Sequence, residues 1–198
     1  MTRIASLPVD KWDPELRQLL QVDTAPLPDV HLKILGVYAN APALAKAFFT
    51  FEHAFWQAFT LRRRLLEMLR LRIAFHNQCR SCMAMRTEAA LADGLTEDLV
   101  CSLEKPQESN DLTAAEKAAL AFADKFATDH LSITDDTFAQ LHEHFDTGEV
   151  MELCFQVATF VGYGRMGAVL AMTDDLPDEY HDDAAVLAPW RQAPHEVV

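Results

Sequence analysis

Two cysteines three residues apart carry the clearest chemical signal in this sequence. Cys79 and Cys82 enclose Arg80 and Ser81, and residues three apart lie on the same face of a helix, close enough for their sulfurs to form a disulfide. If a helix begins at Cys79, the thiol of Cys82 lies in its first turn, where free backbone N–H groups and the helix dipole favour a thiolate. The spacing therefore predicts redox chemistry at sulfur.

Two arginines add positive charge around this pair. Arg80 lies between the cysteines, and Arg86 stands one turn beyond Cys82 if the helix continues. An arginine stays cationic at any physiological pH. We therefore expect Arg86 to hold the sulfur of Cys82 ionised.

Glu67 and His76 are the candidate proton carriers. On an unbroken helix Glu67 would stand about 18 Å from Cys79, at a rise of about 1.5 Å per residue, too far to take part. The weak helix formers at 75–78 predict a break, after which two helices can pack side by side and Glu67 can reach the thiols as a proton acceptor or donor. His76 lies in the break itself, where it either approaches the thiols or lines the turn.

Other interpretations of the cysteine pair stay open. Cysteine is often buried as a small hydrophobic residue, so the spacing has a purely structural alternative. Zinc is another, with His76, Cys79 and Cys82 as three ligands, although a stable site needs a fourth and the sequence has no second CxxC and no HxxxH pattern. Cys101 and Cys154 stand alone in apolar helical surroundings, and we expect both in the core.

Composition predicts a single all-α domain over residues 1–198. The chain is 50% apolar, has only six glycines, and contains long runs of residues that favour helix. Its length is sufficient to bury one core. The polar stretch 104–112 marks a possible boundary within that domain.

Charge is unevenly distributed along the chain. The net charge of −13 disfavours nucleic acid, because phosphate binding needs a basic face. Residues 61–86 nevertheless contain seven arginines against one acid, which suits an anionic substrate. The acidic tail 174–198 is expected to be irregular and to wrap a neighbouring subunit.

Capping residues and hydrophobic periodicity predict helices at about 13–20, 30–38, 42–59, 60–75, 79–94, 96–103, 113–128, 134–145 and 146–172. An apolar stripe on the third of these is expected in the core: Leu44, Phe48, Phe51, Phe55 and Phe59. Glu152, Gln156 and Arg165 interrupt the last helix, so we expect a buried central helix and not a membrane span. Arg165 is then expected to pair with Glu67 or another acid, or to line the active pocket. The first residues lack a secretory signal pattern, so the expected location is the cytoplasm.

The residues around the cysteines resemble a known family. The spacing from Glu67 to Cys79, the CxxC, the pair Ala89-Ala90 and the ending Gly94-Leu95-Thr96 are similar to the signature of the alkylhydroperoxidase D-like group, which includes the carboxymuconolactone decarboxylases. The match covers about 65–99, and a looser resemblance to the peroxidase-related branch extends over 112–170. The resemblance implies an all-α, alkylhydroperoxidase D-like helical fold and a homo-oligomer.

The resemblance also implies residue roles. Cys82 would attack a hydroperoxide, Cys79 would resolve the sulfenic acid, Glu67 would take part in a proton relay, and an external dithiol would regenerate the pair without a bound cofactor. The family's peroxidase motif has histidines where this chain has Ser81 and Arg86. Since an arginine cannot shuttle a proton at neutral pH, that relay cannot operate unchanged.

Two further functions remain as alternatives to reduction of a hydroperoxide or disulfide substrate. One is a lyase of the carboxymuconolactone decarboxylase type, in which the arginines bind an anionic substrate; its activity would survive loss of both cysteines. The other is a structural or redox-responsive oligomer without turnover, which would stay inactive after Arg86→His.

Overall fold

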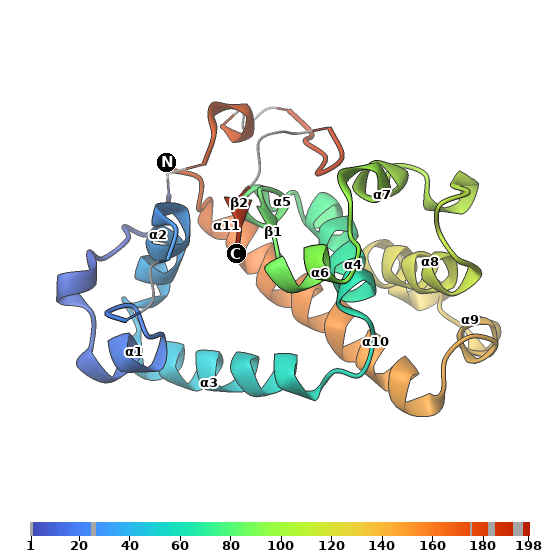
Figure 1. The fold of residues 1–198 in the computed structure, drawn as a ribbon, viewed down its shortest axis with the longest axis horizontal. Helices are drawn as coiled ribbons and strands as arrows, with labels where there is room; N and C mark the ends of the chain where they lie inside the picture. The colour runs from blue at the N-terminus through green and yellow to red at the C-terminus, as the bar shows by residue number, and fades with distance from the viewer. Residues whose placement is uncertain (1, 25–26, 175, 182–184, 192–195) are drawn as a thin grey trace.

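The computed structural model describes residues 2–24, 27–174, 176–181, 185–191 and 196–198, and it confirms the predicted all-α class (Figure 1). Asp175, Asp182, Asp183 and Pro194 of the acidic tail lie outside the described residues. The helices and strands are α1 (Pro14–Leu19), α2 (Asp29–Tyr38), α3 (Pro42–Ala58), α4 (Arg63–Asn77), α5 (Arg80–Met83), β1 (Met85–Arg86), α6 (Glu88–Ala92), α7 (Glu97–Ser102), α8 (Ala114–Thr128), α9 (Asp135–His142), α10 (Thr147–Thr159), α11 (Arg165–Leu170) and β2 (Glu196–Val197).

Local signals set several helix ends where the sequence predicts them. The Asp13 carboxylate accepts two backbone N–H groups at the start of α1. Thr113 and Glu116 form a reciprocal capping box at the start of α8. Beyond the C-terminal end of α6, Gly94 has a φ of +89°, a left-handed conformation that costs glycine little. These ends follow from contacts within one turn of the chain.

The central element is α4, which is surrounded by other helices. It packs most extensively against α8 and also contacts α6 and α10. The α4 side chains that are at most 1% exposed include Leu66, Met68, Leu69, Leu71 and Ile73. The same apolar cluster contains Leu103 and Leu112, on either side of the polar stretch 104–112. Segments before and after that stretch therefore share one core.

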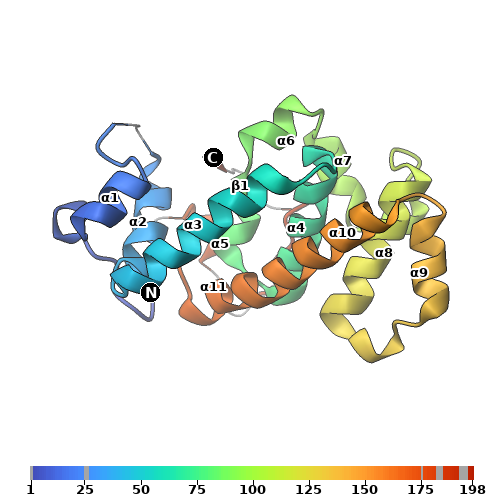
Figure 2. The same cartoon turned by 90° about the horizontal axis from the view of Figure 1, so that it is seen from below.

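The long helix α3 lies at the side of this core (Figures 1 and 2). Its aromatic rings bridge to the helix beside it, with Phe48 4.5 Å from Tyr163 between ring centroids and Phe55 6.5 Å from Phe155. Phe59 is buried, whereas Leu44 is 74% exposed and Phe51 is 47% exposed. The expectation that the whole stripe is core is wrong, because α3 is covered on one side only.

The helix predicted at 146–172 is present, with an interruption. α10, a π-helical turn at Phe160–Gly164 and α11 form one segment, Thr147–Leu170. Its 24 residues have a mean hydropathy of 1.3 over the most apolar window and could cross a membrane by length and composition alone. Only 28% of that window is buried, because one face packs on the core and the other is open. The expectation that this helix is buried all round is therefore wrong, because its outer face is exposed.

The prediction of a single helix at 79–94 is wrong. The chain forms α5, β1 and α6 in its place, and β1 pairs in parallel with β2 from the C-terminus (Figure 1). The carbonyls of Ala84 and Arg86 accept the N–H groups of Glu196 at 2.7 Å and Val198 at 2.9 Å. These long-range hydrogen bonds replace the ones that a continuing helix would form. The described tail residues thus pack on their own chain, and the expected contact with a neighbouring subunit stays a prediction.

Candidate functional site

A left-handed turn after α4 brings the cysteines into place. α4 ends at Asn77, and Gln78 adopts φ 52° and ψ 39°, which confirms the predicted break. The N–H of Cys79 then donates to the carbonyl of Ala74 at 3.0 Å. The Gln78 amide group donates to and accepts from the backbone of Leu187, both at 3.0 Å, so the C-terminal segment holds the turn.

Cys79 and Cys82 form a disulfide across the single-turn helix α5, with their Cα atoms 5.2 Å apart. Cys79 is the N-cap residue of α5, so the CxxC stands at the start of a helix as predicted. Cys79 is fully buried, whereas Cys82 is half-buried. Of the two cysteines, Cys82 is therefore the more exposed residue.

Two hydrogen-bonding groups surround the buried sulfur. The backbone N–H of Cys82 donates to Cys79 Sγ at 3.3 Å, and the Ser81 hydroxyl oxygen lies 3.6 Å from the same atom. Hydrogen-bond donors stabilise a thiolate more than a thiol. On reduction of the disulfide, this arrangement favours negative charge on Cys79, whereas the helix-stabilised thiolate was expected on Cys82.

Glu67 is ion-paired with Arg70 inside the core. The Glu67 carboxylate accepts from Arg70 Nε at 2.8 Å and Nη2 at 2.6 Å, and from the Thr87 N–H at 3.1 Å. Burial has the largest single influence and raises the pKa of Glu67, but Arg70, the Thr87 N–H and Arg86 together outweigh it. The net pKa lies below the ordinary value, so Glu67 is ionised near neutral pH.

Arg70 connects Glu67 to the backbone of the CxxC segment. Its Nη1 donates to the Cys82 carbonyl at 2.6 Å, and its Nη2 donates to the Met85 carbonyl at 2.7 Å. The turn does bring Glu67 to this segment, as predicted. Its carboxylate is nevertheless connected to the Cys82 backbone through Arg70, with both carboxylate oxygens already engaged.

Arg86 is a buried structural cation whose hydrogen bonds go to Glu97 and to carbonyl groups. Its Nε and Nη2 donate to the Glu97 carboxylate at 2.9 and 3.1 Å, and its side chain is fully buried. It also donates to the carbonyls of Met83, Met85 and Pro189. The expectation that Arg86 shares a helix face with Cys82 is wrong, because the helix ends before it.

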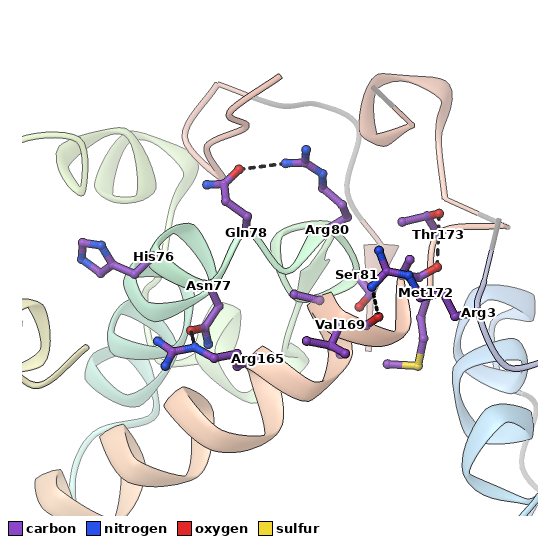
Figure 3. A pocket seen from close by; sticks show the side chains of 13 residues that line it. Arg3, His76, Asn77, Gln78, Arg80, Ser81, Arg165, Val169, Met172 and Thr173 are labelled. Carbon is purple, nitrogen blue, oxygen red and sulfur yellow. Dashed lines mark hydrogen bonds between the residues drawn. The ribbon is translucent and has the colours of Figure 1, made fainter. Parts of the chain in front are cut away.

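His76 is directed toward α8. Its Nε2 lies 2.7 Å from Asp124 Oδ1, and Arg72 donates to both oxygens of the same carboxylate. Burial raises the pKa of Asp124, but these hydrogen bonds and charges outweigh it and the net pKa is lowered. Figure 3 shows His76 pointing away from Ser81. Among the residues that the structure describes, no group of three His, Cys, Asp or Glu side chains is arranged to hold a metal.

The other two cysteines are free thiols in the structure. Cys101 is exposed, so the expectation that it lies in the core is wrong; its sulfur faces the carbonyl of Trp190 at 3.7 Å. Cys154 is half-buried, and burial raises the pKa of its thiol. Neither thiol takes part in the disulfide.

Two glycines let the last helix approach the disulfide closely. A Cβ at Gly167 would stand 3.2 Å from Cys79 Sγ, and a Cβ at Gly164 would stand 2.9 Å from Asn77 Nδ2 and 4.0 Å from Cys82 Sγ. Gly164 belongs to the π-helical turn, a distortion that is frequent at functional sites. The absence of a side chain at both positions permits this packing.

A pocket of about 520 Å³ opens beside Arg80 and Ser81, the residues between the two cysteines (Figure 3). Its described lining residues are Arg3, His76, Asn77, Gln78, Arg80, Ser81, Arg165, Gly167, Ala168, Val169, Ala171, Met172 and Thr173. Arg165 is exposed, and its Nε donates to Asn77 Oδ1 at 3.2 Å. The expected pairing with Glu67 is therefore wrong, and Arg165 lines this pocket, whose part in the activity stays a prediction.

Several residues of the site were not identified from the sequence. Arg70 stands three residues after Glu67, and that helical spacing of opposite charges was an available signal. Gly164 and Gly167 in an apolar helix also indicate close packing. Arg3 gave no signal, because it reaches the pocket only through tertiary contacts.

The fold and the site together define an all-α protein with a CxxC disulfide on a short helix, packed beneath two glycines of the last helix. Residues 42–125 match the model of the carboxymuconolactone decarboxylase family, which confirms the family resemblance seen in the sequence. An uncharacterised protein from Mycobacterium tuberculosis is 32% identical over 91 residues, 46% of this chain. The match covers 32% of that protein, so the chain spans about a third of the length of the curated relatives that it matches.

Solved structures extend the likeness to most of the chain. A peroxidase-related protein from Ralstonia eutropha, an alkylhydroperoxidase AhpD core, is similar with a TM-score of 0.74 and 21% identity, over 90% of this chain and 94% of that one. The debrominase Bmp8 in complex with 2,3,4-tribromopyrrole is similar with a TM-score of 0.69 and 18% identity, over 91% and 94%. At these identities the likeness is one of fold, and it confirms the alkylhydroperoxidase D-like fold.

Proposed function

We propose that this protein is a CxxC-dependent thiol oxidoreductase that reduces an organic hydroperoxide. The observation that carries the proposal is the Cys79–Cys82 disulfide, in which one cysteine residue is fully buried and the other is half-buried. That asymmetry suits a pair with one attacking and one resolving cysteine. An external dithiol in a reducing cytoplasm would regenerate the thiols.

The proposed chemistry runs in three steps. The Cys82 sulfur attacks the terminal oxygen of the hydroperoxide, the O–O bond breaks, and the alcohol leaves with the thiol proton, so that Cys82 becomes a sulfenic acid. Cys79 attacks the Cys82 sulfur, the disulfide forms and water leaves. The dithiol then returns two electrons and two protons by thiol–disulfide exchange.

The surroundings of Cys79 support its role as the resolving cysteine. The Cys82 N–H and the Ser81 hydroxyl lie at 3.3 and 3.6 Å from its sulfur and favour the thiolate that attacks the sulfenic acid. The same groups stabilise Cys79 as the leaving thiolate when a dithiol attacks Cys82. No step in this scheme requires a proton from Arg86 or His76, whose side chains are bonded elsewhere.

The test is a thiol count on reduced full-length protein treated with tert-butyl hydroperoxide. We expect Cys79 and Cys82 to be lost from the thiol count, Cys79→Ser to trap a sulfenic acid on Cys82, and Cys82→Ser to abolish hydroperoxide consumption. Cys154→Ser serves as the matched control and should consume hydroperoxide as the natural chain does. The proposal fails if all thiols persist while a control peroxidase is oxidised.

A second candidate function is a carboxymuconolactone decarboxylase-type lyase. The family match over 42–125 and the arginine-lined pocket favour it, because an anionic substrate needs cationic partners. The double variant Cys79→Ser, Cys82→Ser separates the two candidates. Full lyase turnover in that variant would support the second function. Loss of hydroperoxide reduction, with no lyase turnover, would support the first.

A further inference from the structure

The pocket beside the disulfide has two chemically different walls. One wall is apolar and comes from the last helix and the residues after it, with Ala168, Val169 and Met172. The other carries polar and cationic groups, with Asn77 at the end of α4 and Arg165 bonded to it (Figure 3). A volume of about 520 Å³ lies within the range of small-molecule sites. The pocket is thus suited to a ligand with an apolar body and a polar head.

Arg3 and Arg165 bring two positive charges to this pocket from opposite ends of the chain. The Arg3 guanidinium is held by the carbonyl of Val169, and its backbone N–H donates to the carbonyl of Leu170 at 2.9 Å. Both arginine side chains are exposed, so their charges are accessible to a ligand. Within the described part of the chain, the Arg3 guanidinium bonds the Val169 carbonyl and the Arg165 guanidinium bonds the Asn77 amide oxygen, and neither has a carboxylate partner.

Two acids adjoin residues of the lining, and both form hydrogen bonds outside the pocket. Asp124 accepts from Arg72 and His76, and Asp174 accepts the N–H of Thr2 at 2.8 Å. The described lining contains no Asp or Glu. The electrostatic character of the lining therefore favours an anion, even though the net charge of the whole chain is −13.

The pocket floor lies next to the buried sulfur. Ser81 and Gly167 both line the pocket, the Ser81 hydroxyl oxygen is 3.6 Å from Cys79 Sγ, and a Cβ on Gly167 would stand 3.2 Å from it. A ligand in the pocket would therefore be separated from the disulfide by one layer of atoms. Binding in this place lies beside Cys79, and the lining residue Ser81 directly precedes Cys82 in the chain.

We propose that this pocket binds the carboxylate of a small substrate, with Arg3 and Arg165 supplying the positive charge of the lining and the apolar wall holding the hydrocarbon body. A planar guanidinium matches a carboxylate through paired hydrogen bonds. The identification of the ligand as the substrate rests on the proposed function, whereas the binding site itself does not. The substrate class is then a carboxylate-bearing organic hydroperoxide.

Binding is tested on the oxidised full-length protein by isothermal titration calorimetry with hexanoate and with hexanamide. We expect hexanoate to bind at least about tenfold more tightly than its uncharged amide. A hydrogen bond to a charged group contributes more free energy than a tenfold change in affinity requires. Inorganic phosphate, which lacks a hydrocarbon body, should bind more weakly than hexanoate. Equal binding of hexanoate and hexanamide, no binding of hexanoate, or equal binding of phosphate would each overturn the proposal.

Variants locate the site within the chain. Arg165→Met should weaken hexanoate binding about tenfold, and Arg165→Lys should recover part of it. Lys11→Met removes the same charge from an exposed position outside the pocket lining and should leave the affinity unchanged. Arg3→Met is the second variant if Arg165→Met does not fold by circular dichroism. Equal losses in the pocket variant and in Lys11→Met would mean that net charge, and not this pocket, binds the anion.

Turnover separates this proposal from the proposed function. A hydroperoxide that carries a carboxylate should have a lower KM than its methyl ester, and Arg165→Met should remove that preference. If hexanoate binds but no hydroperoxide oxidises the cysteines, the site stands and the peroxidase function fails. If both hydroperoxides are reduced with equal KM and Arg165→Met changes neither, the peroxidase function stands and the carboxylate site fails.

Discussion

The Ser81 hydroxyl oxygen lies 3.6 Å from Cys79 Sγ, and both residues are buried. The hydroxyl can turn its proton toward the sulfur, and this contact matters most when Cys79 carries a negative charge. Ser81 thereby links the pocket, which it lines, to the disulfide, of which it is not a part. It stands where the peroxidase members of the family have a histidine.

Removal of this hydroxyl should destabilise the Cys79 thiolate in the reduced protein. A hydrogen bond to a charged group contributes about 1.5–3 kcal/mol, so Ser81→Ala is expected to move the pKa of this thiol upward. The thiolate absorbance of reduced Cys82→Ser protein, followed against pH with and without Ser81→Ala, measures the shift. Ser81→Thr retains the hydroxyl and should titrate as the parent does; an unchanged pKa in Ser81→Ala would contradict the assignment.

A methyl group at position 167 should strain the contact between α11 and the disulfide. The added Cβ would lie 3.2 Å from Cys79 Sγ and 3.4 Å from Met172 Cε, and overpacking of this kind costs about 1–3 kcal/mol. We expect Gly167→Ala to lower the free energy of unfolding of the oxidised protein in urea titrations. Gly162→Ala is the matched control, because nothing lies within 4 Å of its Cβ position. Equal stability of the two variants would show that the close approach has no energetic consequence.

The buried pair of Glu67 and Arg70 should make the free energy of unfolding fall as the pH becomes acidic. The net pKa of Glu67 is lowered by Arg70 and its other donors against the opposing effect of burial. Its contribution is therefore present above the unfolded-state pKa of about 4.3 and is lost as the pH falls through the lower folded-state value. Glu67→Gln should cost about 3–5 kcal/mol near neutral pH, because it leaves Arg70 as a buried charge without its partner.

Denaturant titrations between neutral and acidic pH measure this effect. The control is Glu108→Gln, which removes a carboxylate from an exposed pair of the same spacing with Lys105 and should change stability little. A Glu67→Gln protein with the stability and the acid dependence of the natural chain would contradict the assignment.

Arg86 is expected to stabilise the attachment of the C-terminal segment. It donates to the Pro189 carbonyl and to Glu97 from a fully buried position. Arg86→Met should therefore increase hydrogen exchange in β1 and in the tail, with the thiolate titration of Cys79 unchanged. Arg86→His should not raise hydroperoxide turnover, since position 86 faces Glu97. A gain of turnover in Arg86→His would place this residue in the proton path after all.

We propose that the chain forms a homo-oligomer through the open faces of α3 and α10. Phe51 on α3 and Met151 and Phe155 on α10 are about half exposed, and grouped apolar exposure of this kind marks interaction surfaces. Sedimentation velocity should show an assembly that Phe155→Asp dissociates. Leu131→Asp, at an exposed leucine outside these two helices, should leave the assembly intact. A monomeric natural chain would contradict the proposal.

The sequence by itself determined the helices whose signals are local. Asp13 and Thr113 begin helices because their side chains accept N–H groups of the next turn, and Gly94 ends one because it tolerates a positive φ. The helix start at the CxxC belongs to the same class of feature, since the weak helix formers at 75–78 predict the break before it. Backbone geometry within one turn settles all of these.

Tertiary structure alone decided which groups meet the sulfurs. Arg86 turned to Glu97 and His76 to Asp124 because those carboxylates come from other helices, and the pattern of residues along the chain does not specify such partners. The helix after Cys82 stopped because the C-terminal strand supplied hydrogen bonds from the far end of the chain. A charged or polar side chain binds the partner that packing brings within about 3 Å, and for these residues that partner was distant in sequence.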